Sequence, residues 1–195
     1  MTNERPILFS GAMVRAILDG RKTQTRRMVK GFPLQLLAPE NFTPEYVADP
    51  ENEFCPYGQM FDRLWVRETW AQPAALDPGP TVYRADYPAC VPAGFENIPP
   101  ADAIRWKPSI HMPRYACRLG LAITGVRVER LNDCSEADAI AEGIERDGDG
   151  WLSYAGGSCV QLPTTSYASL WDSINGAGAW EANPWVWVVE FRRVA

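Results

Sequence analysis

A lysine and a threonine three positions apart are the first residues in this sequence whose types suggest chemistry. Lys22 and Thr25 lie in the segment DGRKTQTRRM, residues 19–28, within a stretch (15–30) that holds six cations and a single acid, Asp19. Neighbouring positive charges and any burial disfavour protonation of a lysine, so Lys22 could serve as a general base. The same cations could instead simply bind a phosphate group. Thr25 offers a hydroxyl, although a β-branched residue in a strand needs no chemical role.

The backbone must be irregular if these two side chains are to meet. In an ideal strand, positions 22 and 25 face opposite sides, because successive side chains alternate. Gly20 precedes them and permits a turn. We therefore expect Lys22 on that turn, with Thr23, Thr25 and Arg27 on one face of the following strand.

Two carboxylates also stand out by position. Glu142 lies in the last turn of an expected helix, where the helix dipole disfavours negative charge, so it is either solvated or held by cations such as those around Lys22. Glu68 shares a strand face with Leu64 and Val66 and is expected to point inward, where a carboxylate needs a cationic partner. A structural ion pair with an arginine accounts for Glu68 more simply than catalysis does.

Aromatic residues are abundant, whereas metal ligands are sparse. Of the eight tryptophans, most must belong to the core, but one or two lining a cleft could stack on a base, for about 1–3 kcal/mol each. Trp65 and Trp70 flank Glu68. The single histidine, His111, and five scattered cysteines without a CxxC pair argue against a zinc site or a disulfide framework. There is no Gly-rich phosphate loop and no serine-elbow motif, and we expect neither metal nor cofactor.

Short elements must position these residues. Ser10 and Ser135 are the expected N-caps of two helices, with Asp138 in capping-box position after Ser135. Hydrophobic patterning and these capping signals predict strands at residues 5–9, 63–70, 81–86, 118–131 and 183–194, and helices at 11–20, 135–143 and 165–176. The parity of the apolar positions flips across Thr124–Gly125, which predicts a bulge, and bulges bend strands around small barrels. Most of the 17 prolines fall between residues 32 and 114, so that stretch should be loop-rich. The pattern predicts an α+β fold centred on a small mixed barrel.

Composition limits the class of protein further. A chain of 195 residues is long enough for one domain with a full core. No segment has the apolar length of a membrane span and no secretory signal is visible, so we expect a cytoplasmic protein that contacts no membrane. The net charge is −5, while the cations gather in one patch. That distribution favours a small phosphate-bearing ligand over a long polyanion.

The motif resembles a known family. GRKTQTRR fits the GxKxxxxR signature of the ASCH domain, a relative of the PUA-like RNA-binding barrels, with Gly20, Lys22 and Arg27 in place. The chain is also similar to the longer ASCH proteins of bacteriophages and prophages in five blocks: RPILFSGAMVRAILDGRKTQTRR, LWVRETW, KPSIHMPR, RVERLNDCSEADAIAEGI and LWDSING with NPWVWVVEF.

This resemblance implies a fold and an activity. The fold would be one PUA-like domain over residues 1–195, a small β-barrel with short helices packed around it and Pro-rich insertions at about 31–60 and 72–112. Small bacterial ASCH proteins are amidohydrolases that remove the acetyl group from N4-acetylcytidine without a metal. Their lysine, threonine and glutamate match three residues here as a catalytic set: Lys22, Thr25 and Glu142. Four further residues are assigned to substrate binding: Arg26, Arg27, Glu68 and Trp65.

The implied mechanism is acyl transfer to a threonine. Lys22 takes the proton of Thr25, whose oxygen attacks the amide, while Glu142 orients the lysine or protonates the leaving nitrogen. Arg26 or Arg27 would hold the oxyanion or a substrate phosphate. The substrate would be a modified cytidine, as a nucleoside or in RNA. Two alternatives remain open: a non-catalytic RNA- or nucleotide-binding module, and, third, a ribonuclease.

Overall fold

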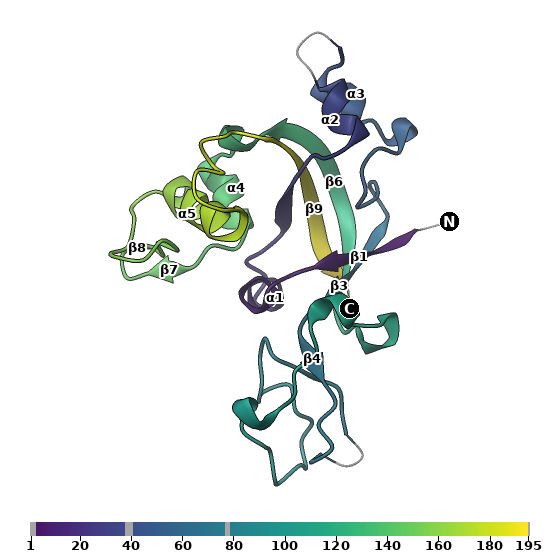
Figure 1. Cartoon of the computed structure of the whole chain (residues 1–195), viewed down its shortest axis with the longest axis vertical. Helices are drawn as coiled ribbons and strands as arrows, with labels where there is room; N and C mark the ends of the chain where they lie inside the picture. The colour runs from purple at the N-terminus through teal and green to yellow at the C-terminus, as the bar shows by residue number, and fades with distance from the viewer. Residues whose placement is uncertain (1–2, 38–40, 77–78, 195) are drawn as a thin grey trace.

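The core of the molecule is a five-stranded, mostly antiparallel sheet. The computed structural model describes residues 3–37, 41–76 and 79–194. In spatial order, the strands are β1 (Glu4–Leu8), β3 (Arg63–Arg67), β6 (Gly120–Arg130), β9 (Trp185–Val194) and β2 (Gln24–Met28). β1 runs parallel to β3, and the other neighbours are antiparallel. Figure 1 shows β6 and β9 as long curved ribbons at the centre of this sheet.

A β-bulge accompanies the curvature of the central strands. The register between β6 and β9 shifts between Ile123 and Gly125, which confirms the bulge predicted from the change in parity. β1 and β2 are the two edges, and no ladder joins them within the described part of the chain. The expectation of a closed barrel was therefore wrong: the protein has an α+β fold built on an open, curved sheet.

A side chain, and not a backbone ladder, spans the gap between the two edges. Helix α1 (Gly11–Leu18) connects β1 to β2, and Ser10 caps it as predicted. Arg27 on β2 donates from Nη2 to the carbonyl oxygen of Leu8 at the end of β1, over 2.7 Å. This seam lies where barrel closure would have been needed.

Two helices cover the same side of the sheet. They are α4 (Glu136–Ala141) and α5 (Pro163–Asn175), seen together in Figure 1. A capping box between Ser135 and Asp138 begins α4, as the sequence indicated. α5 begins two residues earlier than expected, because Pro163 occupies its first turn. Their buried residues form one cluster with β9, in which Tyr167 and Trp171 pack near Val186 and Val188.

The two Pro-rich stretches fold in different ways. The insertion at 31–60 contains two short helices that the sequence analysis did not predict, α2 (Phe32–Leu36) and α3 (Pro44–Ala48), and it packs on the sheet through Val47 and Trp187. The stretch at 72–112 forms a loop-rich lobe beyond the end of the sheet (Figure 1). It has its own small core, which includes Leu76 and Ile104.

The remaining strands are short. The expected strand at 63–70 ends at Arg67 and resumes as β4 (Trp70–Ala71), which pairs with β5 (Val82–Tyr83). A hairpin of β7 (Arg146–Asp147) and β8 (Gly150–Trp151) follows α4. No helix in the described residues is long and apolar enough to cross a membrane.

Candidate functional site

A pocket of about 440 Å³ lies between the sheet, α5 and the insertion at 31–60. Its floor is formed by β2 and β9, which contribute Thr25, Arg26, Arg27, Met28 and Trp187. The α5 wall and its neighbours contribute Met13, Glu142, Tyr167, Leu170, Trp171, Ile174 and Asn175. The opposite wall is formed by Lys30, Pro33, Phe54, Pro56 and Tyr57. The volume falls within the range of small-ligand sites.

Lys22 sits on an irregular turn beside this pocket, as the sequence required. Gly20 has a φ of +74°, and the backbone N–H groups of Arg21 and Lys22 both donate to the carbonyl of Ala16. The chain therefore becomes a strand only at Gln24. Lys22 is 2% exposed, and its ammonium points to the end of α4 instead of into solvent.

Glu142 meets Lys22 at that point. Lys22 Nζ lies 2.9 Å from Glu142 Oε2 and 2.8 Å from the Glu142 backbone carbonyl. The carboxylate is buried, and Arg26 Nη1 donates to its other oxygen over 3.2 Å. A glutamate at a helix C-terminus, unfavourable with respect to the dipole, is thus held by two cations. The cations expected to hold Glu142 were those around Lys22, and the structure identifies them as Lys22 itself and Arg26.

Gly143 allows the end of α4 to pack closely against the turn that carries Lys22. Gly143 has a φ of +85°, a conformation that favours glycine, and ends the helix. A Cβ at Gly143 would lie 2.8 Å from Lys22 Cβ and 2.9 Å from Ala16 Cβ. The absence of a side chain at position 143 is therefore what brings Glu142 within reach of Lys22.

The guanidinium of Arg26 is surrounded by carboxylates. Besides Glu142, it binds Glu129 over 2.6 Å and approaches Asp138 over 3.5 Å. Burial lowers the pKa of Arg26, but the nearby Cys134, Glu142 and Glu129 outweigh it, so the pKa rises above the usual range. Arg127 continues the network to Glu129, Asp138 and Glu190. This guanidinium therefore positions Glu142 and has little left to offer a ligand.

Burial decides the electrostatics of Lys22. It lowers the pKa of the ammonium, Glu142 opposes this effect, and the charges of Arg27 and Arg26 add to it. The net result is a pKa below the ordinary lysine value, which favours a neutral amine more than in solvent. Such an amine can accept a proton.

Thr25 lies on β2, opposite Val189 of β9, and its side chain contributes to the pocket floor. It is 2% exposed. Lys22 Nζ and Thr25 Oγ1 make no hydrogen bond with each other; the ammonium instead uses two donors on Glu142. Glu142 therefore lies beside Lys22 and lines the same pocket as Thr25, but the structure shows no hydrogen bond between the Lys22 amine and the Thr25 hydroxyl.

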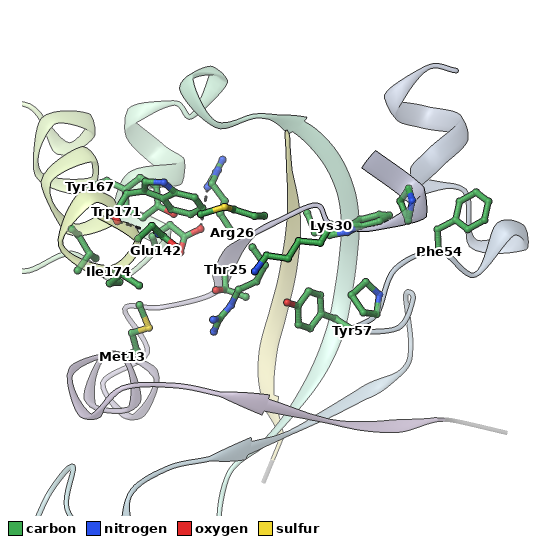
Figure 2. Close-up of a pocket in the computed structure, with 17 residues that line it drawn as sticks. Met13, Thr25, Arg26, Lys30, Phe54, Tyr57, Glu142, Tyr167, Trp171 and Ile174 are labelled. Carbon is green, nitrogen blue, oxygen red and sulfur yellow. Dashed lines mark hydrogen bonds and ion pairs between the residues drawn. The ribbon is translucent and has the colours of Figure 1, made fainter. Parts of the chain in front are cut away.

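Arg27 and Lys30 are the uncompensated cations of the pocket. Neither forms an ion pair with a described carboxylate, and among the described residues the side chain of Arg27 makes one hydrogen bond, to the carbonyl of Leu8. Arg27 Nε is buried without a partner among the described residues. Figure 2 shows Lys30 reaching along the pocket in the direction of Thr25.

Glu68 and Trp65 lie outside the pocket. Glu68 is 1% exposed and accepts two hydrogen bonds from Arg118, at 2.9 and 3.0 Å. This is the structural ion pair that the sequence analysis weighed against catalysis. Trp65 is on β3, where the guanidinium groups of Arg67 and Arg114 lie over its ring. Neither residue lines the cleft that holds Thr25.

Several pocket residues were not identified from sequence. Tyr57 and Phe54 come from the insertion, and Tyr167 comes from α5. Burial and the charge of Glu142 raise the pKa of Tyr167 well above its usual value, so its phenol stays protonated. One or two of the eight tryptophans were expected to line a cleft, and Trp171 and Trp187 do so, although both are largely buried and no local pattern distinguishes them from core tryptophans.

Comparison with known proteins gave no match. A scan against models of protein families, a search of curated proteins and a search of solved structures each found no significant similarity to this chain. The ASCH resemblance therefore rests on the motif and on the order of the sequence blocks.

Proposed function

We propose that this protein is a metal-independent amidohydrolase of the ASCH, PUA-like type that removes the acyl group from N4-acylated cytidine. The observation that carries the proposal is the buried Lys22–Glu142 pair, at 2.9 Å, next to a pocket whose floor contains Thr25. The curved sheet, with α1 and α5 around a cleft lined by Arg27 of the motif, also supports it.

The chemistry follows from the charge state of Lys22. A neutral amine takes the proton from Thr25 Oγ1, and the oxygen attacks the amide carbonyl of the substrate. Collapse of the tetrahedral intermediate breaks the C–N bond, and the proton passes to the departing cytosine nitrogen. Water then hydrolyses the threonine ester, releasing the carboxylic acid and the free hydroxyl. Because Lys22 is bound to Glu142 in the structure, the amine must turn toward Thr25, or act through water, when substrate is present.

Glu142 and Arg26 have positioning roles in this scheme. Both oxygens of Glu142 accept hydrogen bonds, one from Lys22 and one from Arg26, so in this scheme the carboxylate orients Lys22. Arg26 fixes Glu142 in turn. The sequence-based assignment of Arg26 to substrate binding is replaced by this role in the proposal.

The direct test uses purified protein and N4-acetylcytidine, followed by the ultraviolet change on conversion to cytidine. Thr25→Val keeps the shape and the β-branch but removes the nucleophile, so kcat should fall by about a thousandfold or more. Thr23→Val is the matched control, because Thr23 is exposed two positions earlier on the chain. Quenching of pocket tryptophans by cytidine should survive in both variants. If no N4-acylcytidine is turned over at high enzyme concentration, the hydrolase proposal is wrong.

A second candidate is a nucleotide-binding module without catalysis. It is favoured by one observation: Lys22 donates to Glu142 and makes no hydrogen bond with Thr25, as expected if the cluster only stabilises the fold. In that case Thr25→Val would leave nucleotide binding unchanged, and the wild-type protein would hydrolyse no N4-acylcytidine.

A further inference from the structure

The cations of the pocket fall into two groups that differ in charge compensation. Lys22 and Arg26 are buried and each is bound to carboxylate. Arg27 and Lys30 line the same pocket and form no ion pair within the described residues. The only acid among the lining residues is Glu142, and it is already shared by Lys22 and Arg26. Two positive charges are therefore left for a ligand.

These two cations have donors to spare. Arg27 uses one N–H on the Leu8 carbonyl, and a guanidinium carries five. Lys30 is exposed and makes no described hydrogen bond. Tyr57 lines the same pocket as these two cations. Burial raises the pKa of its phenol, and the charge of Arg27 opposes that effect. An ammonium, a guanidinium and a phenol form a donor set suited to phosphate.

The arrangement gives the pocket two ends. In Figure 2, Tyr57 lies on the insertion side, while Glu142, Tyr167 and Trp171 lie on the α5 side, with Thr25 between them. The α5 end is aromatic and its charges are balanced, which suits a base. The uncompensated positive charge comes from Arg27 on the floor strand β2 and from Lys30, which directly precedes the insertion. A volume of about 440 Å³ has room for a base, a sugar and one phosphate.

We infer that the pocket is built for a nucleoside monophosphate, whose phosphate binds Arg27 and Lys30, in preference to an unphosphorylated nucleoside. The inference rests on the proposed function for the identity of the base and deepens it by naming the substrate class. Two cations match the two charges that a terminal phosphate carries near neutral pH.

A long polynucleotide fits the surroundings less well. The insertion at 31–60 holds no cation and carries Glu45, Glu51 and Glu53, all exposed, and the chain has a net charge of −5. Repulsion from these acids would act on phosphates outside the pocket, but not on one held between Arg27 and Lys30. The charge distribution therefore favours a mononucleotide over RNA.

The test is a binding measurement that needs no turnover. Cytidine, cytidine 5′-monophosphate and a short oligocytidylate are titrated into the full chain, with tryptophan fluorescence or calorimetry as the readout. The monophosphate should bind at least about tenfold more tightly than cytidine at low ionic strength, as expected for charge-assisted hydrogen bonds. This advantage should shrink as salt is added.

Variants assign the effect to the two cations. Lys30→Gln and Arg27→Gln should each remove most of the preference for the monophosphate, measured as the ratio of the two dissociation constants of the same variant for cytidine and for the monophosphate. Arg105→Gln, at an exposed arginine outside the pocket, is the charge-matched control and should keep the preference. Because Arg27 also holds Leu8, Lys30→Gln is the decisive variant if Arg27→Gln is poorly folded.

The inference is overturned if the monophosphate does not bind, if it binds no better than cytidine, if Lys30→Gln keeps the preference, or if the oligonucleotide binds more tightly than the monophosphate. Failure of the proposed function looks different: the monophosphate preference is then present while no N4-acylcytidine is hydrolysed. Hydrolysis without a phosphate preference leaves the proposed function standing and rejects this inference.

Discussion

At the scale of single residues, Lys22 shows how burial changes an ordinary side chain. A solvated lysine has a pKa of about 10.4 and is a poor base at neutral pH. Here burial lowers that pKa, and the opposing charge of Glu142 does not restore it. The same glutamate holds the amine at a fixed place, 2.9 Å from its carboxylate. Glu142 thus orients the amine of Lys22, while burial in the surrounding protein lowers the pKa of that amine.

This balance predicts a pH profile for the proposed hydrolase. The neutral amine is the active form, so kcat/KM should rise with pH through the folded-state pKa of Lys22, which lies below its usual value. Lys22→Arg keeps the positive charge but cannot lose its proton in this range, so it should abolish the rise and reduce kcat by about 10²- to 10⁴-fold. Steady-state kinetics from about pH 6 to pH 10 would measure both effects. A wild-type profile that is flat over this range contradicts the assignment of Lys22 as the base.

At the scale of elements, the site depends on how the end of α4 packs on the turn before β2. The Thr23 N–H donates to the carbonyl of Ala141, and Gly143 fits against Lys22 and Ala16 without a side chain. Helix α4 follows the bulged strand β6 and is far from residues 19–28 in sequence, so the fold alone brings the two segments together. The catalytic set of the proposal is therefore a contact between two elements.

A pair of glycine variants isolates this contact. Gly143→Ala combines a positive φ with a steric clash, whereas Gly148→Ala has a positive φ of +57° and nothing within 4 Å. Gly148→Ala should lower the free energy of unfolding by about 1–2 kcal/mol, the cost of a left-handed backbone for alanine. Gly143→Ala should cost about 1–3 kcal/mol more, because the packed groups must move.

The two variants should also differ in activity. Urea denaturation gives their stabilities, and assays run well below both transitions give kcat/KM. Gly143→Ala should reduce kcat/KM because it displaces Glu142 from Lys22, and Gly148→Ala should leave it nearly unchanged. Equal activities in two folded variants would mean that the approach of α4 is not required for turnover.

At the scale of the whole molecule, the two Pro-rich stretches have separate roles. The insertion at 31–60 forms a wall of the pocket through Phe54 and Tyr57. The described residues of the lobe at 72–112 contribute nothing to the lining of that pocket, and a partly buried network of ion pairs joins the lobe to the sheet. In that network Arg118 binds Glu68 and Asp86, with its guanidinium 3.9 Å from the centre of the Tyr83 ring.

Because Glu68 lies in the network that joins the lobe to the sheet and outside the pocket, changing it should reduce stability without reducing activity. Glu68→Gln breaks a buried ion pair and should lower the free energy of unfolding by about 3 kcal/mol. Burial, against the effect of Arg118, raises the pKa of Glu68, so the carboxylate depends on that arginine. Because Glu68 and Trp65 lie outside the pocket, Glu68→Gln and Trp65→Phe should change kcat/KM by no more than about twofold. Denaturation and kinetics on the same preparations check this, and a tenfold loss of kcat/KM in a folded variant would return these residues to the substrate site.

The sequence by itself determined what local physics controls. Ser10 and Ser135 begin helices because their side chains cap free N–H groups, and the parity change at Thr124–Gly125 marks a bulge wherever the strand goes. Only the tertiary structure decided which charges meet. Lys22 and Glu142 are 120 positions apart, Arg26 and not Arg27 joins them, and Glu68 faces Arg118. Whether the edge strands β1 and β2 would pair and close the sheet into a barrel was also decided only by the tertiary structure. Pairing between distant strands depends on packing that no local sequence pattern encodes.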